Sequence, residues 1–235
     1  MATSIRRVLL VATVTLALLG AGSPSVVPVT AKAPPEPVCG VCTDALDEAA
    51  SEHGVVIDRG ESTMTVTVNE DATARFVARV TLTSGAERLR NDTLRAAIVR
   101  DVSYVLVEDR RRLVTAIEDD TLVVRYRSTD VAHLTTGVIR FDAFETRDPP
   151  PLASGGEGTP YPGADRLTLW APSGFRLHGS HGDFSNASAI VWQGNGHRQF
   201  AGTIEEDVVI SFVPDDAVFP GLRVLIADLA DWVGI

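Results

Sequence analysis

Residues 63–82 alternate between apolar and polar side chains, and this alternation constrains the fold more than any other feature of the chain. Apolar residues take every second position on either side of a polar turn at 69–71, namely Met64, Val66, Val68, Phe76, Ala78, Val80 and Leu82. Successive residues of a strand point to opposite faces of a sheet, so the pattern predicts a β-hairpin with one buried face. That face needs a second layer of structure to cover it.

Apolar residues spaced three and four apart predict helices elsewhere in the chain. One helix is expected over roughly 86–105, and a shorter one over 44–52 with Thr43 as its cap. The last helix is amphipathic, and its apolar face consists of Leu222, Leu225, Ile226, Leu229 and Trp232. Asp228 and Asp231 exclude it as a membrane span. This helix is expected to dock on the sheet of its own domain or on a neighbour in an oligomer.

Further strand patterns set the fold class. A second hairpin is predicted from residues 113–117 and 121–127, around an acidic turn. The remaining strand candidates are 137–144, 166–170, 175–178, 189–192 and 208–212. Many hairpins with few helices indicate an α+β fold, made mainly of antiparallel β-hairpins in a sandwich-like sheet with two or three helices packed on it.

The chain divides into a signal, a leader and one domain. We expect a signal peptide over 1–33, a Pro-rich leader with a Cys-x-x-Cys motif over 34–42, and a single α+β domain over 43–235. A Pro- and Gly-rich loop interrupts this domain and offers an alternative division into two lobes. The loop is 149–163, and the lobes are 55–145 and 163–213.

The first residues have the three parts of an export signal. Arg6 and Arg7 precede an apolar run at 8–19, and small residues follow. Cleavage fits either the small-x-small pattern at 31–33 or the one at 20–22. The general secretory route and the twin-arginine route both remain open. We therefore expect an exported protein, either extracellular or at the cell surface.

Arginine is the only base after the predicted signal. The chain has 21 bases, 31 acids and a formal charge of −10 at pH 7. Three bases and no acid lie in 1–33, which leaves 18 arginines against 31 acids and a charge of −13. An acidic surface without lysine is typical of salt-loving archaea, although a GC-rich genome favours the same residues. Both interpretations argue against a nucleic-acid partner, because no basic patch is evident.

Cys39 and Cys42 are the only cysteines and form a Cys-x-x-Cys motif ahead of a predicted helix. In an exported chain a short-loop disulfide is the first interpretation. A thiol-active site is an alternative, although thioredoxin-like proteins place a strand before the motif and a Pro-rich leader precedes it here. Pairing between two chains stays open. So does half of a zinc site, completed by His53 or by a second chain.

A second candidate site is the segment from His178 to Asp183. His178, His181 and Asp183 have ligand types and spacing that suit zinc in a loop, which makes zinc the one cofactor that the sequence suggests. The intervening glycines instead favour a turn between strands. Ser180 is not in the strand–turn–helix setting of a hydrolase nucleophile.

Two glycosylation sequons follow the signal. They begin at Asn91 and Asn186, and both fit an exported chain. Asn186 lies in a predicted loop, where an acceptor is accessible. Asn91 lies near a helix start, where Asn91 or Asp92 serves equally well as a cap.

Three features together resemble an exported protein family of halophilic archaea with no known activity. They are the signal, the Cys39-Gly-Val-Cys42 start running into residues 49–54, and the acidic, lysine-free body. The resemblance implies no activity and no catalytic residue. We expect a non-enzymatic binding or structural module at the cell surface, with a protein or envelope component as partner. The alternative is a metal-dependent or thiol-active enzyme that uses Cys39 and Cys42 or the loop from His178 to His181.

Overall fold

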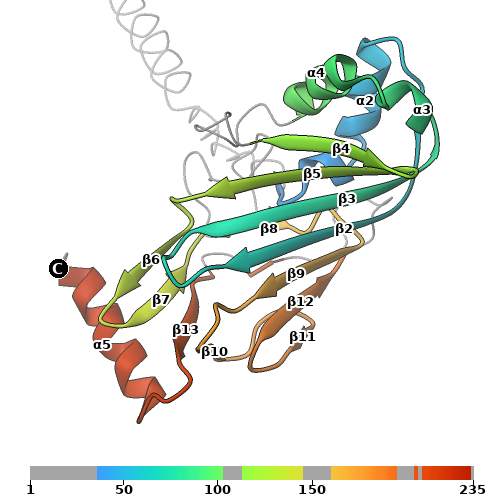
Figure 1. Ribbon diagram of the computed structural model, residues 1–235. Coiled ribbons are helices and arrows are strands. Elements are labelled where there is room, and N and C mark those ends of the chain that lie inside the picture. Colours follow the sequence, from blue (N-terminus) through green and yellow to red (C-terminus); the bar gives the residue numbers. More distant parts are fainter. Residues whose placement is uncertain (1–35, 103–112, 145–159, 195–203, 206–207, 234–235) are drawn as a thin grey trace, which may run out of the picture. The chain divides into compact units, whose positions relative to one another are not determined.

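The computed structural model describes residues 36–102, 113–144, 160–194, 204–205 and 208–233. Contacts group all the described residues into one compact unit. The described part is an α+β fold, as predicted, with a seven-stranded sheet, a four-stranded sheet and a two-stranded ribbon (Figure 1). The loop at 149–163 lies outside the described residues up to position 159.

The large sheet has the strand order β11-β12-β9-β2-β3-β5-β4. Its strands are β2 (Asp58–Val68), β3 (Ala74–Ser84), β4 (Val114–Glu118), β5 (Thr121–Ser128), β9 (Arg166–Trp170), β11 (Phe184–Ser185) and β12 (Ala189–Gln193). Both predicted hairpins are confirmed, as the antiparallel pairs β2–β3 and β4–β5. β2 also pairs with β9 in parallel, which joins the first half of the chain to the second within one sheet.

The small sheet has the order β10-β13-β7-β6 and is antiparallel throughout. Its strands are β6 (Ala132–Thr135), β7 (Val138–Phe141), β10 (Phe175–His178) and β13 (Ile210–Pro214). The strand predicted over 137–144 is shorter than expected, because it ends at Phe141 ahead of a turn at 143–144; at its start, Thr136 and Gly137 form a tight turn with positive φ angles of 51° and 79°. The turn leads back to β6, which the sequence pattern missed. β1 (Glu36–Pro37) and β8 (Pro160–Tyr161) form the short parallel ribbon.

In the described ranges, five helical segments accompany the sheets. They are the 3₁₀ turn η1 (Gly40–Cys42), α2 (Ala45–Glu52), α3 (Ala86–Leu89), α4 (Asp92–Val102) and α5 (Pro220–Val233). The single helix predicted over 86–105 is wrong, because it breaks between α3 and α4; positions 103–105 lie outside the described residues. Asn91 causes the break by capping α4, since its Oδ1 accepts a hydrogen bond from the Leu94 amide at 3.1 Å.

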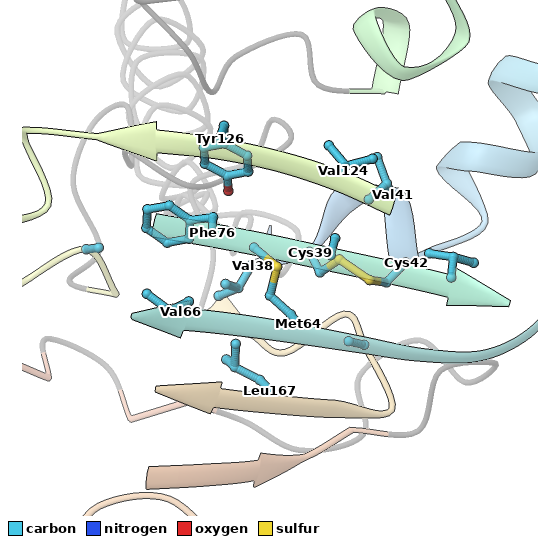
Figure 2. Packing of buried hydrophobic residues seen from close by; sticks show 14 of the residues in the cluster. Val38, Cys39, Val41, Cys42, Met64, Val66, Phe76, Val124, Tyr126 and Leu167 are labelled. Atoms are coloured by element: carbon cyan, nitrogen blue, oxygen red, sulfur yellow. A yellow bond between two sulfur atoms is a disulfide. The ribbon is translucent and has the colours of Figure 1, made fainter. Parts of the chain in front are cut away.

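The main core lies against one face of the large sheet (Figure 2). The helical segments η1, α2 and α4 contribute residues to this core, and Figure 1 shows α2 and α4 together at one end of the large sheet. The small sheet contributes residues of β7 and β13. Phe144 links the two sheets, because its ring packs edge to face against Phe141 of β7 and Trp192 of β12. The distances between ring centroids are 5.0 Å and 5.4 Å. This shared core matches the predicted sandwich-like arrangement.

Candidate functional site

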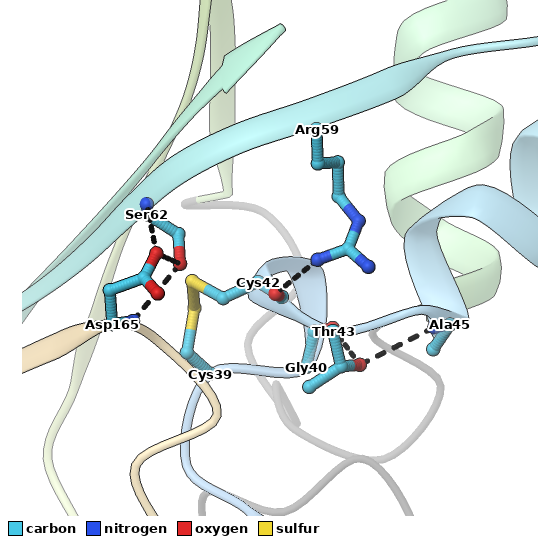
Figure 3. Close-up of a disulfide and its surroundings, with 8 residues drawn as sticks. All are labelled: Cys39, Gly40, Cys42, Thr43, Ala45, Arg59, Ser62 and Asp165. Atoms are coloured by element: carbon cyan, nitrogen blue, oxygen red, sulfur yellow. Dashed lines mark hydrogen bonds between the residues drawn. A yellow bond between two sulfur atoms is a disulfide. The ribbon is translucent and has the colours of Figure 1, made fainter. Parts of the chain in front are cut away.

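Cys39 and Cys42 form a disulfide that is part of the hydrophobic core (Figures 2 and 3). The exposed fractions of the two residues are 2% and 0%, and η1 spans the short loop that the bond closes. Arg59 of β2 donates from Nη1 to the Cys42 carbonyl oxygen at 2.6 Å, and its Nε bonds both carboxylate oxygens of Asp47 at 2.9 Å. The disulfide therefore belongs to a contact that ties η1 and α2 to the large sheet.

This setting is structural in character. Both sulfur atoms are bonded to each other and shielded from solvent, so neither is a thiolate nucleophile or a metal ligand in this state. His53, the residue considered as a third zinc ligand, pairs instead with Asp101 of α4 at 2.6 Å. The predicted Thr43 cap is wrong, because α2 begins one residue later than expected and its N-cap is Asp44, which makes no side-chain capping hydrogen bond; Thr43 Oγ1 accepts a long hydrogen bond from the Ala45 amide at 3.4 Å.

The loop from His178 to Asp183 is a turn between strands, as its glycines indicate. His178 ends β10, and Gly179 and Gly182 have positive φ angles. The Asp183 carboxylate accepts a hydrogen bond from the Gln193 amide at 2.6 Å, and His181 Nδ1 lies 3.5 Å from the Glu205 carboxylate.

These contacts show how the loop side chains are used. Ser180 pairs with Ser185 at 3.2 Å, not with an imidazole. Within the described ranges, no three His, Cys, Asp or Glu side chains are grouped so that they would hold a metal ion. The zinc site at His178, His181 and Asp183 stays a prediction.

The two sequon asparagines have exposed side chains with local structural roles. Asn91 caps α4, as described above. Asn186 Oδ1 accepts hydrogen bonds from the backbone amides of Ser188 at 2.8 Å and Ala189 at 2.9 Å, which fixes the turn before β12. Glycosylation at either position stays a prediction.

The helix α5 is amphipathic as predicted, but its apolar face points to solvent. Six helix residues on one side are largely exposed: Leu222 55%, Leu225 53%, Ile226 46%, Leu229 55%, Trp232 85% and Val233 61%. Val218 at 69% and Phe219 at 73% extend this surface ahead of the helix. We call these eight residues the α5 apolar face. The helix does dock on its own domain, one of the two expected alternatives, but through its other side and not through this face.

The opposite side of α5 lies against the small sheet. Ala227 is the only buried residue of the helix and packs in a minor cluster with Val138, Val213 and Ala217. At 3.6 residues per turn, Ala227 lies on the side of the helix facing away from Leu225 and Leu229. A contact with so few buried side chains contributes little apolar stabilisation.

Polar contacts supply the rest of this attachment. Asp231 accepts a hydrogen bond from Thr135 at 2.8 Å, pairs with His133 at 3.1 Å, and lies 2.8 Å from Arg140. Asp228 also pairs with Arg140, at 2.7 Å. Burial alone would raise the pKa of Asp231, but the hydrogen bonds from His133 and Thr135 and the charge of Arg140 together hold this pKa below its ordinary value.

Phe219 introduces strain at the start of α5. Its φ angle is +58°, a left-handed conformation that a residue with a Cβ rarely adopts. Its carbonyl oxygen accepts hydrogen bonds from the amides of Leu222 at 3.0 Å and Arg223 at 3.3 Å, so this conformation starts the helix. The ring is nevertheless exposed, so no packing inside the domain explains why Phe occupies the position.

The outer face of the large sheet is a second surface of distinct chemistry. Alternation along four strands gathers five arginines and six threonines on it: Arg75, Arg79, Arg125, Arg127, Arg166, Thr63, Thr65, Thr67, Thr81, Thr121 and Thr168. Glu118 of β4 accepts hydrogen bonds from Arg125 and from Arg79, and these lower the pKa of its carboxyl. Val123 of β5 lies on this same face between β3 and β4 and is nevertheless fully buried.

Comparison of the chain with protein-family models, with curated proteins and with solved structures finds no match. Of the helices that the structure describes, none has the length and apolar character needed to cross a membrane.

Proposed function

We propose that this protein is an exported, non-enzymatic binding or structural module of the cell surface, and that the α5 apolar face is its binding surface. One observation carries the proposal: α5 turns its charged side toward its own domain and eight apolar side chains toward solvent. Soluble monomers seldom expose a contiguous apolar patch of this kind, and such patches mark interaction sites.

The energetics of α5 support this assignment. An apolar side chain of this size contributes about 1.5–3 kcal/mol when it is transferred fully from water to an apolar environment. In α5 the buried side of the helix offers only Ala227 and the half-buried Val224 for that purpose. Most of the apolar free energy of the helix is therefore gained only when a further surface covers it.

The residues first considered for chemistry have structural roles that accord with this proposal. The cysteines cross-link η1 within the core, and Asp183 fixes a turn. An enzyme that used these groups would have to open the core or unfold the turn first. The signal at 1–33 and the acidic composition are the grounds for the export and cell-surface part of the proposal.

The test combines localisation with a paired substitution. Leu225→Ser with Leu229→Ser removes two central members of the α5 apolar face, and Val56→Ser with Val114→Ser is the matched control, because those residues are exposed by 80% and 56% elsewhere. We expect the wild-type and control proteins in the cell-surface fraction, and the α5 variant to be folded but released from it. Retention of the α5 variant at wild-type level, or turnover of substrates by the purified wild-type protein, would contradict the proposal.

A further inference from the structure

We infer that the α5 apolar face binds the same face of a second copy of this chain, so that two α5 helices pair antiparallel about a twofold axis. This inference rests on the proposed role of the face as a binding surface and names its partner. Three observations carry it: the spacing of the apolar residues, the distribution of charge around the helix, and the strained Phe219 at its start.

The spacing suits helix pairing. Leu222, Leu225, Leu229 and Trp232 follow one another at intervals of three, four and three residues, the heptad spacing that packs side chains of one helix between those of another. The stripe is continuous over the whole length of α5. A helix with this stripe is complementary to a copy of itself.

The antiparallel arrangement follows from the positions along the stripe. Its centre lies between Leu225 and Ile226, so a twofold axis there sets Leu222 of each copy against Leu229 of the other. Phe219 at one end then meets Trp232 at the other end, which joins the two aromatic residues of the α5 apolar face. Antiparallel helix dipoles also attract one another, whereas parallel dipoles repel.

Charge favours a second copy over other occupants. No charged residue interrupts the α5 apolar face, and both aspartates of the helix are held by the small sheet through Arg140. Two chains of formal charge −10 repel each other over most of their surfaces, and this uncharged face lets them approach. Helices that lie on lipid surfaces carry Lys and Arg on the polar side, where α5 has Asp228 and Asp231 and the single base Arg223.

The size of the contact sets its expected strength. A 14-residue helix is about 21 Å long, and two such helices bury on the order of 1,000 Å² in total, below the standard size of a specific interface. We therefore expect a reversible dimer rather than a permanent one. Because salt screens the repulsion between the acidic bodies and leaves apolar contact intact, the dimer should tighten as salt rises.

The conformation and exposure of Phe219 independently support a contact with a second copy at this position. Strained backbone conformations persist mainly at functional positions, and Gly would fill this one without strain. An exposed Phe in that conformation contributes nothing to its own domain that the structure shows. In the paired helices its ring would be covered.

The first experiment measures the molar mass of the full chain in solution across a concentration series, at about 0.1 M and about 1 M salt. We expect a monomer–dimer equilibrium that tightens with salt. Leu225→Ser with Leu229→Ser should weaken the dimer about 100-fold, because each substitution occurs in both copies. Phe219→Gly should weaken it about fivefold without lowering the melting temperature. Val56→Ser with Val114→Ser should leave it unchanged.

A cross-linking experiment tests the orientation. Both native cysteines are in the disulfide, so a newly introduced cysteine is the only free thiol. Oxidation of a mixture of Leu222→Cys and Leu229→Cys proteins should give the mixed dimer, and neither protein alone should cross-link efficiently. Parallel helices would give the reverse.

Several results would overturn the inference. A monomer at every concentration and both salt levels would do so, as would a dimer that dissociates as salt rises or that survives the paired Leu225 and Leu229 substitutions. A monomer that binds neutral phosphatidylcholine vesicles through α5 would make lipid the occupant. That last result would leave the proposed binding role of the face standing, because release of the α5 variant from the cell surface is measured separately.

Discussion

Replacing both cysteines by alanine tests whether the Cys39–Cys42 bond is a structural cross-link. The bond joins residues three apart in sequence, and a loop that short restricts the unfolded chain by about 2 kcal/mol. Both side chains are buried, so their loss also leaves a small void worth about 1 kcal/mol or slightly more. Cys39→Ala with Cys42→Ala should therefore lower the free energy of unfolding by about 3 kcal/mol.

Urea denaturation measures this loss. The midpoint should fall while the slope of free energy against urea concentration stays close to that of the wild type. Val41→Ala is the matched control, because Val41 lies between the cysteines and is 5% exposed; it removes packing without breaking the cross-link and should cost only about 1 kcal/mol.

Reduction of the wild-type protein completes the test. A buried bond should react with dithiothreitol only as fast as the surrounding core opens. Equal stability of the wild type and the double variant, or reduction at the rate of an exposed disulfide without denaturant, would refute the structural interpretation. The second result would favour the thiol-active alternative.

Two further predictions concern carboxylates. Asp165 accepts hydrogen bonds at 2.7 and 2.9 Å from the amide and hydroxyl of the buried Ser62. Asp165→Ala should therefore lower the free energy of unfolding, measured in urea, by about 1–3 kcal/mol. Asp183→Ala, at an exposed turn, should lower it less, and equal losses would contradict this. The pKa of Asp231 is lowered in the folded state, so its contribution is present above the unfolded value of 3.8 and is lost as pH falls through the lower folded value. Asp231→Asn should therefore reduce stability at pH 7, and this deficit should shrink as pH falls below 3.8; a deficit of constant size down to acid pH would refute the assigned contacts.

Period and burial explain why much of the fold was predictable. A strand with one buried face must alternate apolar and polar residues. The alternation over Met64 to Val68 and Phe76 to Leu82 therefore predicts both the strands and the face that packs in the core. The turn between β4 and β5 is short and polar, which makes that hairpin equally plain. Such local signals do not depend on distant parts of the chain.

Other features depend on distant residues and were missed. The periodicity of α5 defines an apolar side but not what that side meets. The side that the helix turns toward its own domain is set by contacts of Asp228 and Asp231 with the small sheet. Their partners, Arg140, His133 and Thr135, lie 88 to 98 residues earlier in the sequence. β6 is only four residues long, so the alternation of Ala132, His133, Leu134 and Thr135 is too brief to predict a strand. The arginine-rich sheet face could not be predicted from the sequence, because its members are never adjacent in it.

The parallel pairing of β2 with β9 has a consequence for how the chain reaches this fold. Hydrogen-bonded partners on these segments, Ser62 and Asp165, are separated by 103 residues. During synthesis one edge of the first hairpin thus stays unpaired until the chain beyond residue 166 has emerged, and an open edge is a template for wrong partners. Completion of the large sheet is a late, slow event that a truncated chain cannot reach. In a fragment ending before β9, the edge of β2 would stay unpaired and open to pairing with strands of other chains.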